Sequence, residues 1–354
     1  MEKKLLKATS CFLVILCLGV CFSLPFFPKL HQWSVLAREN RKLQEEMQVL
    51  ALEEMQVLAL EDMEAPAEEI DAHLRIQLPE GTKEEDIYMV ENPLYQEISI
   101  YFPGEITDYF SEYKVIGKSD YIADISYYYK ENQGTLVIRT DKVYEADYQY
   151  AQNALYMNFT DLHDRYEKVV VVDAGHGGRA AGAVKQGVYE KDIDLAITNQ
   201  LLALVQDEPM ENVKFYFTRI DDSNPSLQRR VDLANKTDAD LFISVHNNSS
   251  ASGRMNNQHG TLVMYSESQE ESKSKAFAQI CLDNVCANLE SNSRGLMEGD
   301  DIYIIRNSNV PVALIEVGFM TNASELQKLQ NEEYQKSAAR GIYEAIKEAF
   351  AQGF

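Results

Sequence analysis

The stretch VVVVDAGHGG, residues 169–178, joins four consecutive valines to a polar turn rich in glycine. A continuous apolar run of this kind is typical of a strand that is buried on both faces, as in a parallel sheet. In open α/β sheets the turn after such a strand lies at the carboxyl edge, where ligands bind. The stretch therefore predicts a buried strand that presents His176 at the edge of a sheet.

Segments typical of helices and of strands alternate from this stretch to the C-terminus. Helices are expected over residues 190–206, 226–237, 271–289, 322–329 and 331–350, and further strands over 213–219, 239–246, 259–266, 301–306 and 310–318. Strands that alternate with helices imply a sheet covered on both faces. The sequence therefore predicts an α/β domain at residues 166–354, with a mostly parallel or mixed sheet between two layers of helices.

Four residues at the ends of these elements are candidates for a functional site. His176 follows the first strand, His246 ends the strand at 239–246, Glu316 stands near the end of the last strand, and Glu190 opens the first helix. Two imidazoles and one carboxylate are a common ligand set for a catalytic zinc, and a further carboxylate can serve as general acid and base. Each residue alone also has a structural interpretation, such as a helix cap at Glu190.

Several motifs occur in order between residues 168 and 350 and resemble the zinc-dependent N-acetylmuramoyl-L-alanine amidases. They are VVVDAGHGG at 170–178, YEKDIDLAI at 189–197, FTR at 217–219, RRVDLANKTDADLFISVHNNSS at 229–250, HGT at 259–261 and PVALIEVGFMTN at 311–322. The resemblance implies that His176, Glu190 and His246 hold one Zn²⁺ and that Glu316 is the catalytic acid/base. Ala174 departs from the family, which usually has proline there.

The resemblance also implies an activity. Such enzymes are peptidoglycan hydrolases that use zinc-activated water to cleave the amide between N-acetylmuramic acid and L-alanine. One alternative is a zinc peptidase that cuts within the stem peptide, and another is a non-catalytic, anchored wall-binding scaffold. Some relatives carry a helix that covers the metal after the strand of the second ligand histidine; here the short segment 247–258 predicts an open site.

Two further observations concern partners and the middle of the chain. The formal net charge of −23 argues against nucleic acid as a partner, because phosphate binding needs clustered Lys and Arg. Residues 68–165 contain short runs typical of strands, separated by polar turns, and predict a small all-β domain. Its place before the catalytic domain resembles that of wall-targeting modules, which would make peptidoglycan its partner.

The N-terminal residues 1–30 predict a membrane anchor. Three lysines precede an uncharged, largely apolar run at residues 8–27, which is long enough to cross a bilayer. The positive charge favours a cytoplasmic N-terminus, so we expect a single-pass protein at the cell membrane, with its catalytic domain outside the cytoplasm. A cleaved signal peptide and a secreted protein are the alternative.

Residues 31–67 predict a helical stalk. Its stretch 36–63 has neither glycine nor proline, and the octapeptide EEMQVLAL occurs there twice, at 45–52 and 53–60. The apolar spacing is compatible with a short coiled coil and hence a weak dimer. A slipped duplication in a tolerant segment is the other interpretation, and the eight-residue period, which drifts off a heptad seam, favours it.

Overall fold

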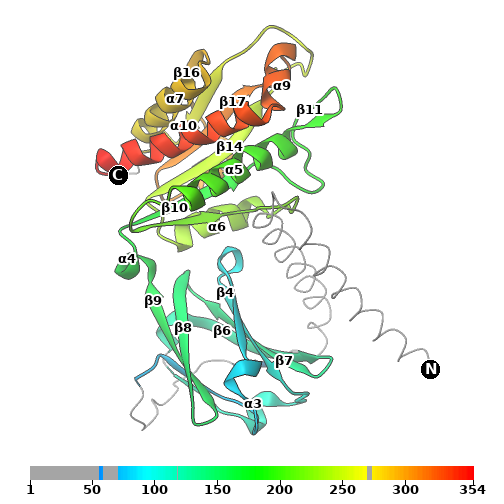
Figure 1. Cartoon of the computed structure of the whole chain (residues 1–354), viewed down its shortest axis with the longest axis vertical. Helices are drawn as coiled ribbons and strands as arrows, with labels where there is room; N and C mark the ends of the chain where they lie inside the picture. Colours follow the sequence, from blue (N-terminus) through cyan, green and yellow to red (C-terminus); the bar gives the residue numbers. More distant parts are fainter. Residues whose placement is uncertain (1–55, 59–70, 118, 269–272) are drawn as a thin grey trace, which may run out of the picture. The chain divides into compact units, whose positions relative to one another are not determined.

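The computed structural model describes residues 56–58, 71–117, 119–268 and 273–354. Its C-terminal part is built on a six-stranded sheet in the order β13-β10-β14-β17-β15-β16 (Figure 1). The strands are β10 (Lys168–Ala174), β13 (Val213–Phe217), β14 (Leu241–Asn248), β15 (Thr261–Tyr265), β16 (Ser293–Glu298) and β17 (Val312–Phe319). Only the β15–β17 pair is antiparallel, so the predicted mixed sheet is confirmed.

Helices cover both faces of this sheet. They are α5 (Glu190–Asp207), α6 (Leu227–Lys236), α7 (Ser274–Leu289), α8 (Tyr303–Arg306), α9 (Ala323–Leu329) and α10 (Glu332–Ala351). Buried residues of α5, α7 and α10 form one hydrophobic cluster with the sheet, and residues of α6 and α8 belong to a second cluster.

The four valines of β10 show why the run is continuous. All four are fully buried, and they alternate between the two clusters: Val170 and Val172 lie in the first, and Val169 and Val171 in the second. Successive side chains of a strand point to opposite faces, so a central strand of a covered sheet needs apolar residues at every position. This packing fixes the point at which the chain leaves the sheet for the turn with His176.

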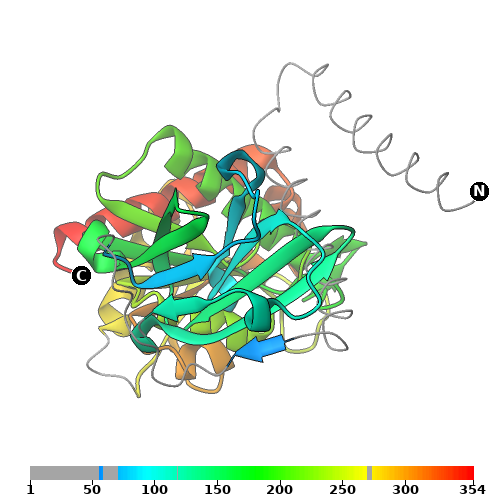
Figure 2. The same ribbon diagram turned by 90° about the horizontal axis from the view of Figure 1, so that it is seen from below.

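The middle of the chain forms two antiparallel sheets, in the orders β1-β6-β7-β4-β3 and β5-β2-β9-β8 (Figure 2). Their strands are β1 (Gln56–Leu58), β2 (Leu74–Gln77), β3 (Tyr88–Asn92), β4 (Glu97–Pro103), β5 (Val115–Gly117), β6 (Ile122–Lys130), β7 (Gln133–Thr140), β8 (Tyr144–Ala151) and β9 (Ala154–Asp161). Ile76, Ile100, Leu136 and Leu155 are among the buried residues of their shared core. The division of the chain into domains at 68–165 and 166–354 stays a prediction.

Two secondary-structure predictions are wrong. Residues 301–306 were expected to form a strand, but Tyr303–Arg306 is the helix α8, and the additional strand is β16 at Ser293–Glu298. A short apolar run does not distinguish a buried strand from a helical turn, and an exposed edge strand needs no apolar alternation. The continuous stalk helix is also wrong at Gln56–Leu58, which pairs with β6 as strand β1.

The prediction of a membrane-spanning protein is contradicted. Among the helices that the structure describes, none has the length and apolar character needed to cross a bilayer. The run at 8–27 that prompted the prediction lies outside the described residues, as does most of the stalk with its suggested dimer. We therefore do not retain the single-pass assignment.

Candidate functional site

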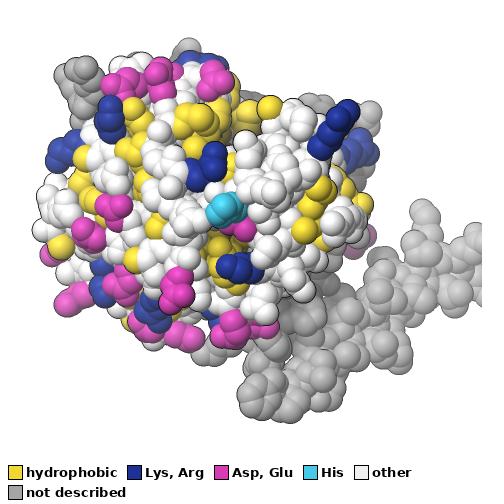
Figure 3. Space-filling model, turned by 90° about the horizontal axis from the view of Figure 1, so that it is seen from above, with side chains coloured by type: hydrophobic (Ala, Val, Ile, Leu, Met, Phe, Trp, Pro, Cys, Tyr) yellow, Lys and Arg dark blue, Asp and Glu magenta, His cyan; other side chains and the backbone are white. Residues whose placement is uncertain are grey.

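The carboxyl edge of the sheet brings the four predicted residues to one place. His246 on β14 and Glu316 on β17 are direct register partners on neighbouring parallel strands. β10 pairs with the edge of β14 that lies opposite β17, and His176 follows β10. Glu190 is the first residue of α5. In Figure 3 a histidine side chain shows at the surface of this face with an acidic side chain directly against it, and Lys or Arg side chains lie above and below the two.

Three of these side chains converge on one point. Oε1 of Glu190 lies 3.0 Å from Nε2 of His176 and 3.1 Å from Nδ1 of His246. The two imidazole rings are 4.8 Å apart between centroids and nearly perpendicular. Burial acts to raise the pKa of Glu190, but the two histidines outweigh it and hold that pKa well below its usual range. The geometry thus directs two nitrogen donors and an ionised carboxylate at one point.

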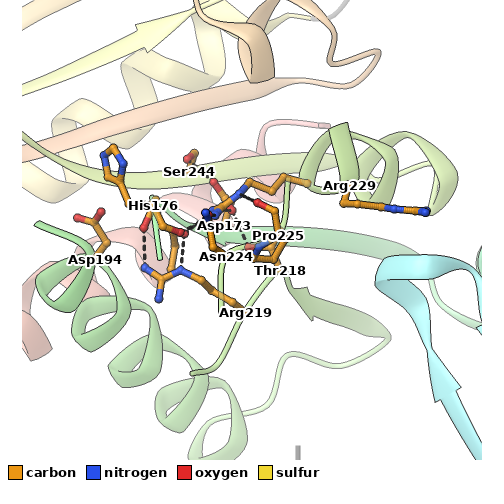
Figure 4. Close-up of polar contacts among 12 residues, drawn as sticks. Asp173, His176, Asp194, Thr218, Arg219, Asn224, Pro225, Arg229 and Ser244 are labelled. Carbon is orange, nitrogen blue, oxygen red and sulfur yellow. Dashed lines mark hydrogen bonds and ion pairs between the residues drawn. The ribbon is translucent and has the colours of Figure 1, made fainter. Parts of the chain in front are cut away.

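A fourth carboxylate, Asp194, belongs to the same cluster and was missed in the sequence. One ligand atom from each of His176, Glu190, Asp194 and His246 lies within 4.8 Å of the others. In Figure 4 the Asp194 carboxylate points from α5 toward the imidazole of His176. The available signal was its spacing, because residues four apart on a helix share a face.

Asp194 is fully buried and accepts a hydrogen bond of 2.8 Å from the side-chain amide of Asn247. Its Oδ2 has no hydrogen-bond partner. Burial, and then the charge of Glu190, raise the pKa of Asp194 well above its usual value. The backbone N–H of Asn247 in turn donates to Oε1 of Glu190 at 3.2 Å, so Asn247 links the two carboxylates of α5.

Glu316 differs from Glu190 in its surroundings. Its Oε2 is buried and has no hydrogen-bond partner. Burial and the negative charge of Glu190 raise the pKa of Glu316 to about 8. A carboxyl group whose pKa lies near neutral pH both accepts and releases protons easily, which is the property that a general acid/base needs.

Two buried arginines hold the turn that carries His176. Arg219 donates to the carbonyl oxygens of Ala174 and Gly175, and Arg230 donates to those of Ala174 and His176 (Figure 4). His176 itself has a φ of +58°, a left-handed conformation that is unfavourable for a residue with a side chain. Both arginines therefore have a structural role, and they fix the backbone that aims the imidazole.

Arg230 also neutralises a buried acid at the end of β10. Its Nη1 lies 2.7 Å from Oδ1 of Asp173, and Thr218 and Ser244 donate further hydrogen bonds to the same carboxylate. Burial acts to raise the pKa of Asp173, but Arg230 and the two hydroxyls lower it below its usual value. Asp173 in the opening motif thus anchors the turn and is not a member of the cluster.

Glycines leave the space that the cluster occupies. A Cβ on Gly175 would lie 2.4 Å from Cε1 of His246, and one on Gly182 would lie 2.5 Å from Oε2 of Glu190. Gly182 also has a φ of +67°, which favours glycine. The close approach of the backbone to these side chains explains why glycine occupies both positions.

No helix covers the site between β14 and β15. Residues 249–260, all of which the structure describes, form turns and irregular structure, as expected for an open site. His259 lies in this segment, where it is exposed and its ring contacts the carbonyl oxygen of Asn257.

Comparisons with known proteins identify the family. The sequence profile of the N-acetylmuramoyl-L-alanine amidases matches residues 170–348, just over half of the chain. The chain is 36% identical over 185 residues to the uncharacterized protein YqiI of Bacillus subtilis, covering 52% of this chain and 86% of that protein. It is 31% identical over 199 residues to the germination-specific N-acetylmuramoyl-L-alanine amidase of that organism, covering 52% and 81%.

A solved structure is similar over the same region. The crystal structure of N-acetylmuramoyl-L-alanine amidase from Clostridium difficile 630 aligns with a TM-score of 0.50 at 31% identity, covering 53% of this chain and 98% of that one. The chain therefore belongs to the N-acetylmuramoyl-L-alanine amidase family.

Proposed function

We propose that this chain, a peptidoglycan amidase by family, is zinc-dependent and uses His176, Glu190 and His246 as metal ligands, with Glu316 as acid/base. The observation that carries the proposal is the convergence of both imidazoles on Oε1 of Glu190, at 3.0 and 3.1 Å. Two ligand atoms that bind one Zn²⁺ tetrahedrally at about 2.0–2.1 Å would lie about 3.3 Å apart, and the two distances at Glu190 are close to this value.

The residues fit a divalent cation on further grounds. The donors are two imidazoles and a carboxylate, a set that suits zinc. Asp194 and Glu316 each carry a buried oxygen without a hydrogen-bond partner, which is costly unless a further group satisfies it. The acidic charge gathered around two histidines supplies a reason for a cation to bind at this point.

The side chains of the chain divide the work between them. When bound, Zn²⁺ supplies a Lewis acid and a water whose pKa is lowered toward about 7. Glu316 accepts a proton from the attacking water at its carboxylate and delivers it to the amine of L-alanine as the amide breaks. Arg219 and Arg230 hold the His176 turn, so that the imidazole does not have to reorganise during the reaction.

Family membership favours the amidase over the two alternatives. A zinc peptidase would use the same four residues but would cut within the stem peptide. A non-catalytic scaffold would not need to keep Glu316 beside an intact ligand cluster.

We also propose a wall-binding role for the all-β unit at residues 68–165. Its place before the catalytic domain is the observation that supports this role.

The test is digestion of purified sacculi by the full chain, with and without a zinc chelator, followed by mass spectrometry of the fragments. Release of stem peptides with a free L-alanine amine, lost with the chelator and restored by zinc, is the expected result. Cleavage between two amino acids would point to the peptidase instead.

Glu316→Gln separates metal binding from proton transfer. The variant should retain zinc, measured by elemental analysis, and lose hydrolysis by about 10²–10⁴-fold. Arg294→Gln, a substitution on the exposed edge strand β16, is a control that should leave both quantities unchanged. Normal turnover by Glu316→Gln would remove the assigned role.

A further inference from the structure

The three-ligand site leaves one oxygen of Asp194 without a role. The side chain is fully buried, and Oδ1 accepts the hydrogen bond from Asn247, but Oδ2 has no hydrogen-bond partner among the residues that the structure describes. A buried carboxylate oxygen without a partner is costly unless another group satisfies it. The free oxygen therefore points to a ligand that the neighbouring side chains do not supply.

Asp194 shares a face of α5 with Glu190. The two residues are four apart on this helix, so their side chains leave it in the same direction. Pairs of metal ligands on one helix use this spacing, because it brings both side chains to one ion. The Asp194 carboxylate points from α5 toward the imidazole of His176 (Figure 4), which is the direction of the metal-site cluster.

The distances place Asp194 within reach of the same ion as the other three side chains. One ligand atom from each of His176, Glu190, Asp194 and His246 lies within 4.8 Å of the others. Two atoms that bind one ion at about 2.1 Å are at most about 4.2 Å apart. The four ligand atoms therefore have to approach one another by no more than about 0.6 Å, which a small side-chain rotation supplies.

The charges favour the same arrangement. Glu190 and Asp194 are carboxylates held close together in a buried site, where like charges repel strongly unless a cation lies between them. Both histidine nitrogens contact Oε1 of Glu190, at 3.0 and 3.1 Å, and leave Oδ2 of Asp194 without a partner. One divalent cation between the two carboxylates would balance both charges and satisfy the free oxygen.

Resting on the proposed function, we infer that Asp194 is a fourth protein ligand of the metal ion, bound through Oδ2, while Asn247 holds its other oxygen. The donor set is then two imidazoles and two carboxylates, and Glu316 stays outside it as the acid/base. Carboxylate ligands suit Mn²⁺, so this site should bind Mn²⁺ more tightly than a site with a single carboxylate does.

Two variants distinguish a metal ligand from a supporting contact. Asp194→Asn removes the charged oxygen but keeps an amide oxygen that can accept the hydrogen bond from Asn247. Asn247→Ala removes this hydrogen bond and keeps the carboxylate. The full chain is loaded with Co²⁺, whose visible absorption becomes more intense as its coordination number falls. Asp194→Asn should intensify the absorption, and Asn247→Ala should leave it as in the wild type.

Metal affinity, measured by chelator competition, is the second readout. Asp194→Asn should lower the affinity for zinc by about 100-fold, and Asn247→Ala by about tenfold at most. The affinity of Asp194→Asn for Mn²⁺ should fall more than its affinity for zinc, because the lost donor is an oxygen. Asp192→Asn, on the exposed side of α5, is the matched control and should change neither the affinities nor the cobalt absorption.

The outcomes separate this inference from the proposed function. If the wild-type chain binds no metal and does not cleave sacculi, the proposed function fails. If it binds zinc and cleaves, but Asp194→Asn has the cobalt absorption of the wild type, the amidase stands and the fourth ligand is overturned.

The wild-type chain alone provides a test that does not depend on the folding of any variant. Four protein ligands and one water give five-coordinate cobalt with weak absorption, as the inference expects. The intense absorption of four-coordinate cobalt in the wild type would show three protein ligands and one water, and would overturn the assignment of Asp194.

Discussion

The guanidinium of Arg230 lies 2.7 Å from the carboxylate of Asp173, and both side chains are almost completely buried. The two residues are 57 positions apart in sequence, and their contact ties the start of α6 to the end of β10. Because Arg230 also bonds the carbonyl oxygens of Ala174 and His176, the pair couples the stability of the sheet edge to the position of the first ligand.

Arg230→Met should destabilise the protein by about 3–5 kcal/mol, because it leaves the charge of Asp173 buried without its partner. The double variant Asp173→Asn/Arg230→Met should lose clearly less than the two single variants added together. Urea unfolding of all four proteins measures the coupling. Additive losses would show that the two side chains do not depend on each other.

The same pair predicts a dependence of stability on pH. The pKa of Asp173 is lowered in the folded protein, so its contribution is fully present above its ordinary pKa of 3.8. That contribution is lost as the pH falls from there through the folded pKa, because the unfolded chain then binds more protons. The difference in unfolding free energy between wild type and Asp173→Asn should therefore shrink below about pH 4. A constant difference down to pH 2 would contradict this.

Gly175→Ala should disable the site while the fold remains. Its new Cβ would meet the ring of His246 at 2.4 Å, and the imidazole would have to move away from Glu190. We expect zinc affinity and hydrolysis to fall at least tenfold, measured by chelator competition and by turnover. Gly187→Ala is a control for backbone strain without a steric clash: Gly187, in the β11–β12 turn, has a φ of +82° but no atom within 4 Å of an added Cβ, so the variant should cost stability and leave zinc affinity unchanged.

The sequence was most informative where one physical requirement determined the residues. The four valines of β10 needed to be apolar on both faces, and polar residues at the ends of parallel strands had to meet at one edge. The secondary structure of residues 293–306 was harder to predict, because an exposed edge strand and a single helical turn leave no periodic pattern in the sequence. Asp194 was missed although its spacing from Glu190 was visible, because the sequence did not indicate the hydrogen bond from Asn247 that holds its carboxylate in the cluster.

Asp194→Ala should weaken metal binding without removing any of the three proposed ligands. It frees the side-chain amide of Asn247, whose backbone N–H contacts Oε1 of Glu190. Loss of such supporting contacts typically costs about 10–100-fold in metal affinity. Chelator competition at fixed pH measures the effect, and Asp192→Ala, on the exposed side of α5, serves as control. Unchanged affinity would show that Asp194 does not support the cluster.

Glu316 predicts that the metal-free protein loses stability as the pH rises. Its pKa is raised from 4.5 to about 8 in the folded chain, so folded protein binds the proton more tightly than unfolded protein does. The unfolding free energy should therefore fall between about pH 5 and pH 8, by a few kcal/mol at most. Glu316→Gln cannot ionise and should reduce this slope, while Asp194, whose pKa is also raised by burial, keeps its own share of it. Urea unfolding of both proteins in the presence of a chelator measures the difference. An equal slope in wild type and variant would mean that Glu316 contributes nothing to it. The pKa of its buried carboxyl would then not be raised, and Glu316 would not hold the proton that the mechanism assigns to it.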